Sequence, residues 1–550
     1  GKKFVMIIEP TIGLKNYSFK LLREGENLDL FVKNSYHKNL INRVWPGRSY
    51  FVDYFNKNAG NYWKKALEDL HTKLNFSGIW LDMNEIAAFS LGQVDMDANT
   101  IPCNDQKSYI YIPGTKVFET ATICPNALHN SGKYEHISVH NYYPNQQAKL
   151  TYKFLEEQFK DAFPFILTRA NAPGIGRWST KWSGDNYGTE EFFKFSIAEV
   201  MSMNLFGVPN AGADICGFGY STPEYLCAKW YQMGSLYPFS RSHSHLDYHR
   251  KEPFMMGKML LETTRKSLNF RYSILKYYYS LMMRKNYSGT IFRPIFFEFY
   301  DDELALSDYV LENTFMIGDA LIVVPNLNEQ EIFESNGYFP AGSWFDLRKN
   351  SKVEKTDHSN GELVKVSTEL YEMPAVFLRG GKIIFRNKVN EDNNNNGKKV
   401  SSSYDLDNEF DIYIAFNTVE FLNNENETFS AKGYIPALEN YESKKSVTKC
   451  VEQSCFIEVI ATLNKNKKDL TILFKKASHY DYSFKNITIR NIYILGLEIQ
   501  TKDILSFTKE NYATYNLNKD TILIGLPNNL SKYELIIVEK ENVEVVVKFK

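Results

Sequence analysis

The sequence has almost no net charge and few cysteines for its length. Its 550 residues include 64 lysines and arginines, 65 aspartates and glutamates, and six cysteines, and its net charge is −1. A balanced charge gives no electrostatic attraction to nucleic acid or to an anionic membrane. No apolar run approaches the roughly 18 residues that span a bilayer. The composition therefore predicts no nucleic-acid partner and no membrane span.

The cysteines lack the Cys-x-x-Cys spacing of zinc and redox sites, and we expect neither a metal nor a cofactor. Their spacing suggests three local disulfides, which are typical of an oxidising compartment. The expected pairs are Cys103 with Cys124, Cys216 with Cys227, and Cys450 with Cys455. The secretory route is also favoured by six Asn-x-Ser/Thr sequons for N-glycosylation, at Asn16, Asn75, Asn286, Asn426, Asn486 and Asn529.

The chain is long enough for two or three domains, and 43% of its residues are hydrophobic. From residue 1 to about 300, apolar strand-like runs alternate with helical stretches such as Phe192–Asn204. This alternation predicts parallel β/α units. Short β-type runs follow, and the polar, asparagine-rich stretch Lys388–Ser403 separates two groups of them.

The segment Gly78–Phe89 carries the first chemical signal. It runs from an apolar, strand-like stretch directly into two carboxylates, Asp82 and Glu85. In barrels of parallel strands the chemistry occurs at the carboxyl ends of the strands, so Asp82 is a candidate nucleophile. An ordinary strand followed by a polar turn explains this motif equally well by itself.

A second acid makes the first one more informative. The apolar stretch Phe165–Leu167 leads to Arg169, and a Gly/Pro-rich loop then leads to Asp185, near Trp178 and Trp182. Indole rings stack on pyranose faces, and arginine donates to hydroxyls. Two carboxyl groups in different environments can act as an ionised nucleophile and a protonated acid. The combination therefore points to glycoside chemistry.

The motifs, taken in their order along residues 1–385, resemble glycoside hydrolase family 31, the α-glucosidases and their relatives. So many motifs in the family's order are hard to obtain by chance. The further matching motifs are Arg43–Gly47, Gly207–Phe218, Trp230–His243, Arg271–Tyr272, Arg293–Pro294, Gly318–Leu321 and Arg379–Gly381.

This resemblance implies an α/β fold built on a (β/α)8 TIM-type barrel, with an inserted subdomain. We expect the catalytic barrel at 1–302 with its insertion at 90–140, followed by two C-terminal β-sandwich domains at 303–387 and 388–550. The chain begins at what resembles the third barrel strand, so the first strands are missing from it. An open barrel exposes unpaired edges. We therefore expect an N-terminal chain or segment of the same precursor to complete it; an expression fragment is the alternative.

The resemblance also implies roles for individual residues in a retaining mechanism. Asp82 matches the nucleophile and Asp185 the general acid/base, and retention requires their carboxyl groups to lie about 5 Å apart. Arg169 and His243 match residues that bind the hydroxyls of the terminal sugar, and Asp214 matches an acid that orients its neighbours. The positions that match walls of the sugar site are Ile7, Trp45, Trp80, Met83, Trp182 and Phe218.

The sequence departs from the family pattern in three places. Glu9 stands where relatives have Asp, and Ile86-Ala87-Ala88 replaces a Pro-Ser step after the nucleophile motif. Lys276 replaces a proline, and we expect it to be a surface change on a helix. None of these departures removes a reacting group.

The expected function is release of terminal glucose from α-glucosides of the maltose, glycogen or starch type. The cysteine-bearing insertion resembles lysosomal and intestinal members, which favours a lysosomal or secreted location. The alternative is trimming of glucose from N-glycans in the endoplasmic reticulum lumen, as in members of the glucosidase II type, with a non-catalytic subunit as partner. Arg241–Pro253 and Gly132–His136 are similar to that type. A non-catalytic binding or scaffold protein with a glycosidase fold is the second alternative.

Overall fold

The computed structural model divides the chain into two compact units, which are described separately below. The first unit is Gly1–Trp182 with Phe206–Asn210, and the second is Ser183–Leu205 with Ala211–Lys550. The described residues are 2–15, 19–103, 117–284, 289–329, 332–353, 360–389, 400, 402–407, 409–417, 428–436, 443–452, 456–464, 469–476, 487–495, 513–516, 521–522, 533–539 and 543–549.

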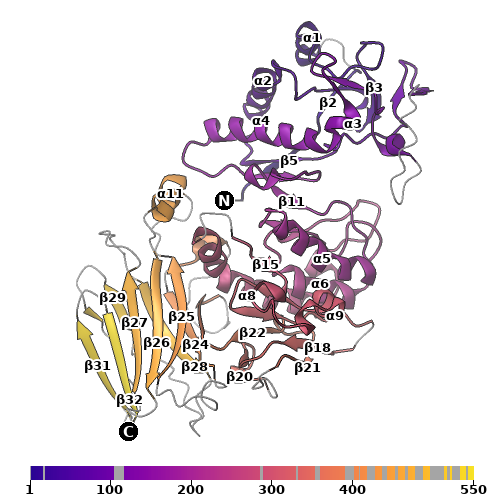
Figure 1. The fold of residues 1–550 in the computed structure, drawn as a ribbon. Helices are drawn as coiled ribbons and strands as arrows, with labels where there is room; N and C mark the ends of the chain where they lie inside the picture. The colour runs from indigo at the N-terminus through magenta and orange to yellow at the C-terminus, as the bar shows by residue number, and fades with distance from the viewer. Residues whose placement is uncertain are drawn as a thin grey trace. The chain divides into compact units, whose positions relative to one another are not determined.

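Parallel strands form the main sheet of the first unit. They are β1 (Val5–Ile8), β5 (Gly78–Leu81), β10 (Ile166–Thr168) and β11 (Thr180–Trp182), in this order across the sheet, and two of them, β5 and β11, are labelled in Figure 1. Each strand pairs in parallel with the next, so all four carboxyl ends lie at one edge. This confirms the strand-like segments expected from the sequence.

Two helices of the first unit, α2 (Ala59–His71) and α4 (Tyr143–Gln158), pack against each other. The indole N–H of Trp63 donates to Thr151 Oγ1 across this contact, at 2.9 Å, and both side chains are buried. The unit's other elements are α1 (Lys20–Asn27), α3 (His136–Val139), the antiparallel strands β2 (Thr11–Gly13), β4 (Gly47–Phe51) and β3 (Ile41–Val44), the hairpins β6 (Gln93–Val94) with β7 (Thr100–Ile101) and β8 (Leu128–His129) with β9 (Tyr134–Glu135), and the 3-10 turns η2 (Phe118–Ala121), η3 (His140–Tyr142) and η4 (Ile175–Arg177).

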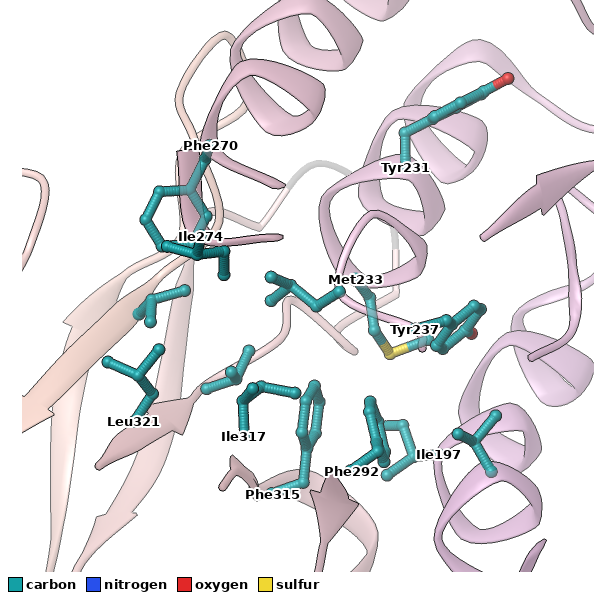
Figure 2. Close-up of a cluster of buried hydrophobic side chains, with 14 of the residues drawn as sticks. Ile197, Tyr231, Met233, Tyr237, Phe270, Ile274, Phe292, Phe315, Ile317 and Leu321 are labelled. Carbon is teal, nitrogen blue, oxygen red and sulfur yellow. The ribbon is translucent and has the colours of Figure 1, made fainter. Parts of the chain in front are cut away.

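A large apolar core holds the second unit together. It packs α5 (Glu190–Leu205), α6 (Glu224–Gly234) and α8 (Lys258–Met283) against strands of a six-stranded sheet. Figure 2 shows Ile197, Met233, Phe270, Phe292 and Phe315 of this core, with Tyr237, Ile274, Ile317 and Leu321. The sheet order is β15 (Phe292–Arg293), β16 (Phe315–Ile317), β17 (Leu321–Val323), β22 (Val376–Arg379), β19 (Trp344–Asp346) and β20 (Ser351–Lys352).

Shorter elements connect this core. They are β12 (Ala211–Gly212), the parallel pair β13 (Asp214–Ile215) and β14 (Arg241–Ser242), α7 (Pro253–Met256), α9 (Asp308–Asn313), the hairpin β18 (Glu334–Phe339) with β21 (Glu362–Ser367), and the 3-10 turns η5 (Ile295–Phe297), η6 (Leu304–Leu306) and η7 (Ser403–Asp405).

The C-terminal part of the second unit forms a ten-stranded sheet, drawn in orange to yellow in Figure 1. Its order is β30 (Thr521–Ile522), β29 (Ala513–Asn516), β28 (Ile487–Leu495), β24 (Glu409–Ala415), β23 (Lys382–Asn387), β25 (Thr428–Pro436), β26 (Phe456–Asn464), β27 (Asp469–Lys476), β32 (Val543–Phe549) and β31 (Tyr533–Glu539), with α11 (Lys444–Glu452) between β25 and β26 in sequence. The domain boundaries at 302 and 387 stay predictions, although β15 pairs with β16 and β23 with β24 across them.

Two of the expected disulfides are confirmed. Cys103–Cys124 has a Cα–Cα distance of 5.4 Å, and Cys216–Cys227 one of 4.7 Å. The third expected pair includes Cys455, which lies outside the described residues, as do all the sequon asparagines except Asn75, which is exposed. Among the described residues, no helix combines the length and the apolar character that crossing a membrane requires.

The expectation that Lys276 is a surface change was wrong. Its side chain is buried in α8, and its ammonium donates to the carbonyl oxygen of Asp407. Burial lowers the pKa of Lys276 to about 8. Helical periodicity alone could not reveal this position, because the residues that cover it come from a distant part of the chain.

Candidate active site

Strand register brings the predicted residues of the first unit to one edge of the sheet. Ile7 pairs with Trp80, and Trp80 pairs with Leu167. Side chains alternate along a strand, so Trp80 and Asp82 project to the same side of β5. The ladders continue past the strand ends, because Asp82 N–H donates to Ile8 O at 3.1 Å and Arg169 N–H donates to Leu81 O at 3.2 Å. This edge is where parallel-strand barrels place their chemistry.

Arg169 joins two carboxylates at this edge. Its Nη1 lies 2.9 Å from Asp82 Oδ1, while Nε and Nη2 donate to the two carboxylate oxygens of Glu85, each at 2.9 Å. Burial raises the pKa of Glu85, but the hydrogen bonds and charge of Arg169 outweigh it and leave that pKa below its usual value. Met83 N–H also donates to Asp82 Oδ1, at 2.8 Å. Asp82 is therefore held in place by an ion pair with Arg169 and a hydrogen bond from a backbone N–H.

Glu9 is a third carboxyl group at the same edge, directly after β1. Burial raises its pKa to about 7, and the nearby Asp82 carboxylate adds to the rise. A hydrogen bond from Thr11 Oγ1, at 3.2 Å, acts in the opposite direction. The pKa of Glu9 is thus raised and that of Glu85 lowered at the same edge, because Glu85 accepts two hydrogen bonds from the guanidinium of Arg169, the Arg169 fork, and Glu9 accepts none of them.

The predicted wall residues of the first unit differ in their burial. Trp182 is 1% exposed, and its ring meets that of Trp80 edge to face, with centroids 5.3 Å apart. Met83 is buried, and Arg169 Nη2 lies 3.3 Å from its sulfur. Ile7 and Trp45 are exposed by 42% and 71%. Trp80, Met83 and Trp182 therefore gather around the Asp82 edge, whereas Trp45 packs edge to face on Phe89.

The predicted acid belongs to the second unit. Asp185 is exposed in a bend after Gly184, whose φ of +82° suits glycine. Asp214, on β13, is completely buried and forms an ion pair with Arg241 of β14, at 2.9 Å. Burial raises the pKa of Asp214 to about 7, and Asp185 adds to this, although Arg241 lowers it. Asp214 Oδ2 is buried without a hydrogen-bond partner among the described residues.

His243 stacks on Phe218 close to this pair. Their ring centroids are 5.1 Å apart and their planes differ by 29°. Burial lowers the pKa of His243 to about 4, and the charges of Arg241 and Lys251 act in the same direction. His243 is therefore neutral at physiological pH and can both donate to and accept from a hydroxyl.

The first unit contains a chain of three histidines that sequence reasoning missed; His129 and His136 are buried, and His140 is half-buried. His129 Nδ1 lies 3.2 Å from Asp53 Oδ1, His129 Nε2 lies 3.0 Å from His136 Nδ1, and His136 Nε2 lies 2.9 Å from His140 Nδ1. Burial lowers the pKa of His136 well below 6.5 and that of His140 to about 4, although the charge of Glu85 opposes the shift at His140. We call Asp53, His129, His136 and His140 the histidine chain.

The histidine chain ends at Asp53, whose side chain is also held by the backbone. Its carboxyl oxygens accept backbone N–H groups from Phe55, at 3.1 Å, and from Asn130, at 2.5 Å. The only sequence signal was the spacing of His136 and His140, four residues apart on one helical face.

The predicted site residues therefore form two groups. Asp82 and Arg169, with Trp80, Met83 and Trp182, belong to the first unit, and Asp185, Asp214, Phe218 and His243 belong to the second. Each group combines carboxyl groups, an arginine and aromatic rings. Sequence reasoning gave no role to Glu85 or Arg241, although both stand in the quoted motifs.

Comparisons with known proteins give the family. A model described as "Glycosyl hydrolases family 31 TIM-barrel domain" matches residues 1–281, and one described as "Glycosyl hydrolase family 31 C-terminal domain" matches 288–384. Lysosomal alpha-glucosidase of Bos taurus is 32% identical over 400 residues, which cover 70% of this chain and 41% of the relative. Lysosomal acid alpha-glucosidase of Tetrahymena pyriformis is 27% identical over 97% of this chain and 60% of its own length.

The fold agrees with solved structures. The crystal structure of the glucosidase II alpha subunit in its Tris-bound form matches with a TM-score of 0.72 and 21% identity, over 100% of this chain and 53% of that one. This chain therefore spans about half the length of the structures it matches, and less of several sequence relatives. Since the barrel model covers more than half of the chain, the chain belongs to glycosyl hydrolase family 31, with its TIM-barrel domain followed by the C-terminal domain of that family.

Proposed function

We propose that the protein is a retaining α-glucosidase that releases terminal glucose from α-glucosides. The observation that carries the proposal is the Arg169 fork, which holds Asp82 and the ionised Glu85 at the carboxyl edge of parallel strands. A carboxylate fixed by an arginine and a backbone N–H is an oriented anion, which is what a nucleophile at an anomeric carbon requires.

In this proposal the reaction takes two steps. Asp82 attacks the anomeric carbon while Asp185, as the acid, protonates the departing glycosidic oxygen. Water then attacks the glycosyl-enzyme intermediate, and Asp185 accepts its proton as the base. Retention requires about 5 Å between the two carboxyl groups, which a crystal structure of the assembled enzyme can measure.

The remaining predicted residues receive binding roles. Arg169 and neutral His243 are proposed to hold hydroxyls of the terminal glucose, and the buried Asp214 to orient Arg241. The proposed apolar walls of the sugar site are Ile7, Trp45, Trp80, Met83, Trp182 and Phe218.

We further propose that an N-terminal segment of the same precursor completes the barrel, and that the residues after the barrel form two β-sandwich domains. The proposal is supported by the relatives, which are much longer than this chain. Lysosomal relatives and two buried disulfides support a lysosomal or secreted location.

Trimming of glucose from N-glycans in the endoplasmic reticulum is the second candidate. It is supported by the segment Arg241–Pro253, whose sequence resembles members of the glucosidase II type. A solved complex of endoplasmic reticulum glucosidase II contains a catalytic subunit and the binding domain of a regulatory subunit. A non-catalytic subunit would then be a partner of this protein.

Hydrolysis of a chromogenic α-glucoside by the assembled enzyme tests the proposal. We expect turnover by the wild-type protein and its loss in Asp82→Asn, which keeps the shape but removes the charge. Absence of turnover with both acids intact would instead favour a non-catalytic binding protein. Glucose release from maltose, compared with release from glucosylated high-mannose glycans, separates the two candidate substrates.

A further inference from the structure

Six aromatic rings of the second unit form a continuous surface from the predicted sugar ligand His243 to the neighbourhood of Asp185. Phe218 lies between His243 and His245, with ring centroids 5.1 and 5.4 Å away. The further ring contacts are His245 to Tyr248 at 5.7 Å, Tyr248 to Tyr220 at 6.0 Å and Tyr220 to Tyr187 at 4.7 Å. We call these six residues the aromatic platform.

Three tyrosines of the platform are exposed. Tyr187 is 41%, Tyr220 50% and Tyr248 36% exposed. The rings of Tyr187 and Tyr220 stack with 21° between their planes, so the two rings form one continuous surface. Contiguous exposed apolar surface is a feature of ligand-binding and interaction sites.

Backbone hydrogen bonds hold the platform in place. Phe218 N–H and Gly219 N–H both donate to Asn186 O, each at 2.9 Å, and Gly188 N–H donates to Gly219 O at 2.8 Å. A Cβ at Gly219 would lie 2.6 Å from Cδ1 of Tyr187, so only glycine allows this ring its position. The buried Lys251 adds a bond to Gly217 O at 2.5 Å. The surface is therefore arranged before any ligand binds.

Tyr220 also has an unfavourable backbone conformation. Its φ is +64°, in the left-handed region that bulky residues rarely adopt. A glycine or asparagine would adopt this conformation at a lower energetic cost. A tyrosine at this position therefore contributes something other than stability, and its exposed ring is the feature available to do so.

We propose that the tyrosines of the aromatic platform, Tyr187, Tyr220 and Tyr248, bind the sugar residues on the leaving-group side of the scissile bond, beyond the terminal glucose at His243. The proposal rests on the proposed function, because it takes Asp185 as the acid. An acid must lie within hydrogen-bond reach of the departing oxygen, so the sugar that carries this oxygen lies beside Asp185. Tyr187 follows Asp185 by two residues, and aromatic faces stack on the apolar faces of pyranoses. The ligand class is an α-linked oligosaccharide of at least three units.

The test compares substrates of different length in the assembled enzyme, that is, this chain with the N-terminal segment proposed above. The variants are Tyr220→Asn, which removes the ring but suits a left-handed backbone, and Tyr187→Ala. Tyr220→Phe keeps the ring, and Tyr300→Ala removes a tyrosine that is 73% exposed elsewhere in the unit. The substrates are an aryl α-glucoside, maltose, maltotriose and a glucosylated mannose oligosaccharide.

We expect Tyr220→Asn and Tyr187→Ala to lower kcat/KM for the longer substrates about tenfold, equivalent to about 1.4 kcal/mol. The aryl glucoside should change less than twofold, and both control variants should behave as wild type. A larger loss on maltotriose identifies an α-glucan as the ligand, and a larger loss on the mannose oligosaccharide identifies an N-glycan. Unchanged length preference in both ring-deleting variants overturns the proposal.

If wild-type enzyme does not hydrolyse the aryl glucoside, the proposed function fails, and direct binding decides the platform separately. Saturation-transfer NMR with maltotriose should then show contacts to the sugar in wild type that weaken in Tyr220→Asn. Equal signals in the two proteins overturn the proposal.

Discussion

The histidine chain predicts a specific dependence of stability on pH. In the folded protein burial lowers the pKa of His140 from 6.5 to about 4. Between pH 6.5 and pH 4, His140 is therefore protonated in the unfolded state but mostly neutral in the folded state. Above pH 6.5, where His140 is neutral in both states, its contribution to the free energy of unfolding is fully present. As the pH falls from 6.5 toward 4, protonation of the unfolded state progressively lowers the free energy of unfolding.

The magnitude follows from the two pKa values. One unit corresponds to about 1.36 kcal/mol, so His140 accounts for a loss of about 2 kcal/mol at pH 5 and about 3 kcal/mol at pH 4. The variant His140→Gln keeps a hydrogen-bonding side chain but cannot take up the proton. Between pH 7 and pH 4 the free energy of unfolding should therefore fall in both proteins, but the fall should be about 3 kcal/mol smaller in the variant than in wild type.

Urea denaturation followed by tryptophan fluorescence at pH 7, 5 and 4 measures this difference. His37→Gln is the matched control, because His37 is an exposed histidine of the same unit. Glu9 acts in the opposite direction, since its raised pKa favours the folded state as the pH falls from 7 toward 4.5. It is present in wild type and variant alike, so it cancels in the comparison. An identical pH dependence in wild type and His140→Gln would refute the reasoning.

Three further predictions concern other parts of the molecule. Arg169→Met should lower kcat/KM about tenfold to a hundredfold, because one charge-assisted hydrogen bond is worth about 1.5–3 kcal/mol. Arg169→Lys keeps the charge but cannot bind Glu85 with two parallel bonds, so it should recover only part of the loss. Lys276→Met should raise the free energy of unfolding at pH 7 by about 1–3 kcal/mol, measured in urea, because it removes a buried charge; a destabilised variant would show that the hydrogen bond of Lys276 outweighs its burial. Replacing Cys216 and Cys227 by alanine should lower the unfolding free energy by about 3 kcal/mol, from the short loop that the bridge closes, and unchanged stability would contradict this.

Much of the barrel domain could be predicted because its signals are local. The strand leading to Asp82 and the one leading to Arg169 were found from short apolar runs that end in polar residues, and α5 was found from its helical stretch. Two disulfides followed from cysteine spacing alone, since a short loop limits the partners that each cysteine can reach.

Residues whose surroundings come from distant segments could not be predicted in this way. Lys276 looked like a surface residue, but its carbonyl partner Asp407 lies far along the chain and its side chain is buried. The histidine chain was missed for the same reason, because Asp53 and His129 are remote in sequence.

The sequence by itself determined the family, the parallel β/α pattern and which carboxylates are candidates for the chemistry. The family and the candidate carboxylates follow from the order of the motifs. The β/α pattern follows from the spacing of apolar residues, which reflects the side-chain repeat of strands and helices. Only the tertiary structure decided the ionisation of these groups, because a pKa depends on burial and on charges brought together by folding. The Arg169 fork that keeps Glu85 ionised, and the burial that keeps Glu9 and Asp214 protonated up to about pH 7, exist only once the strands have paired.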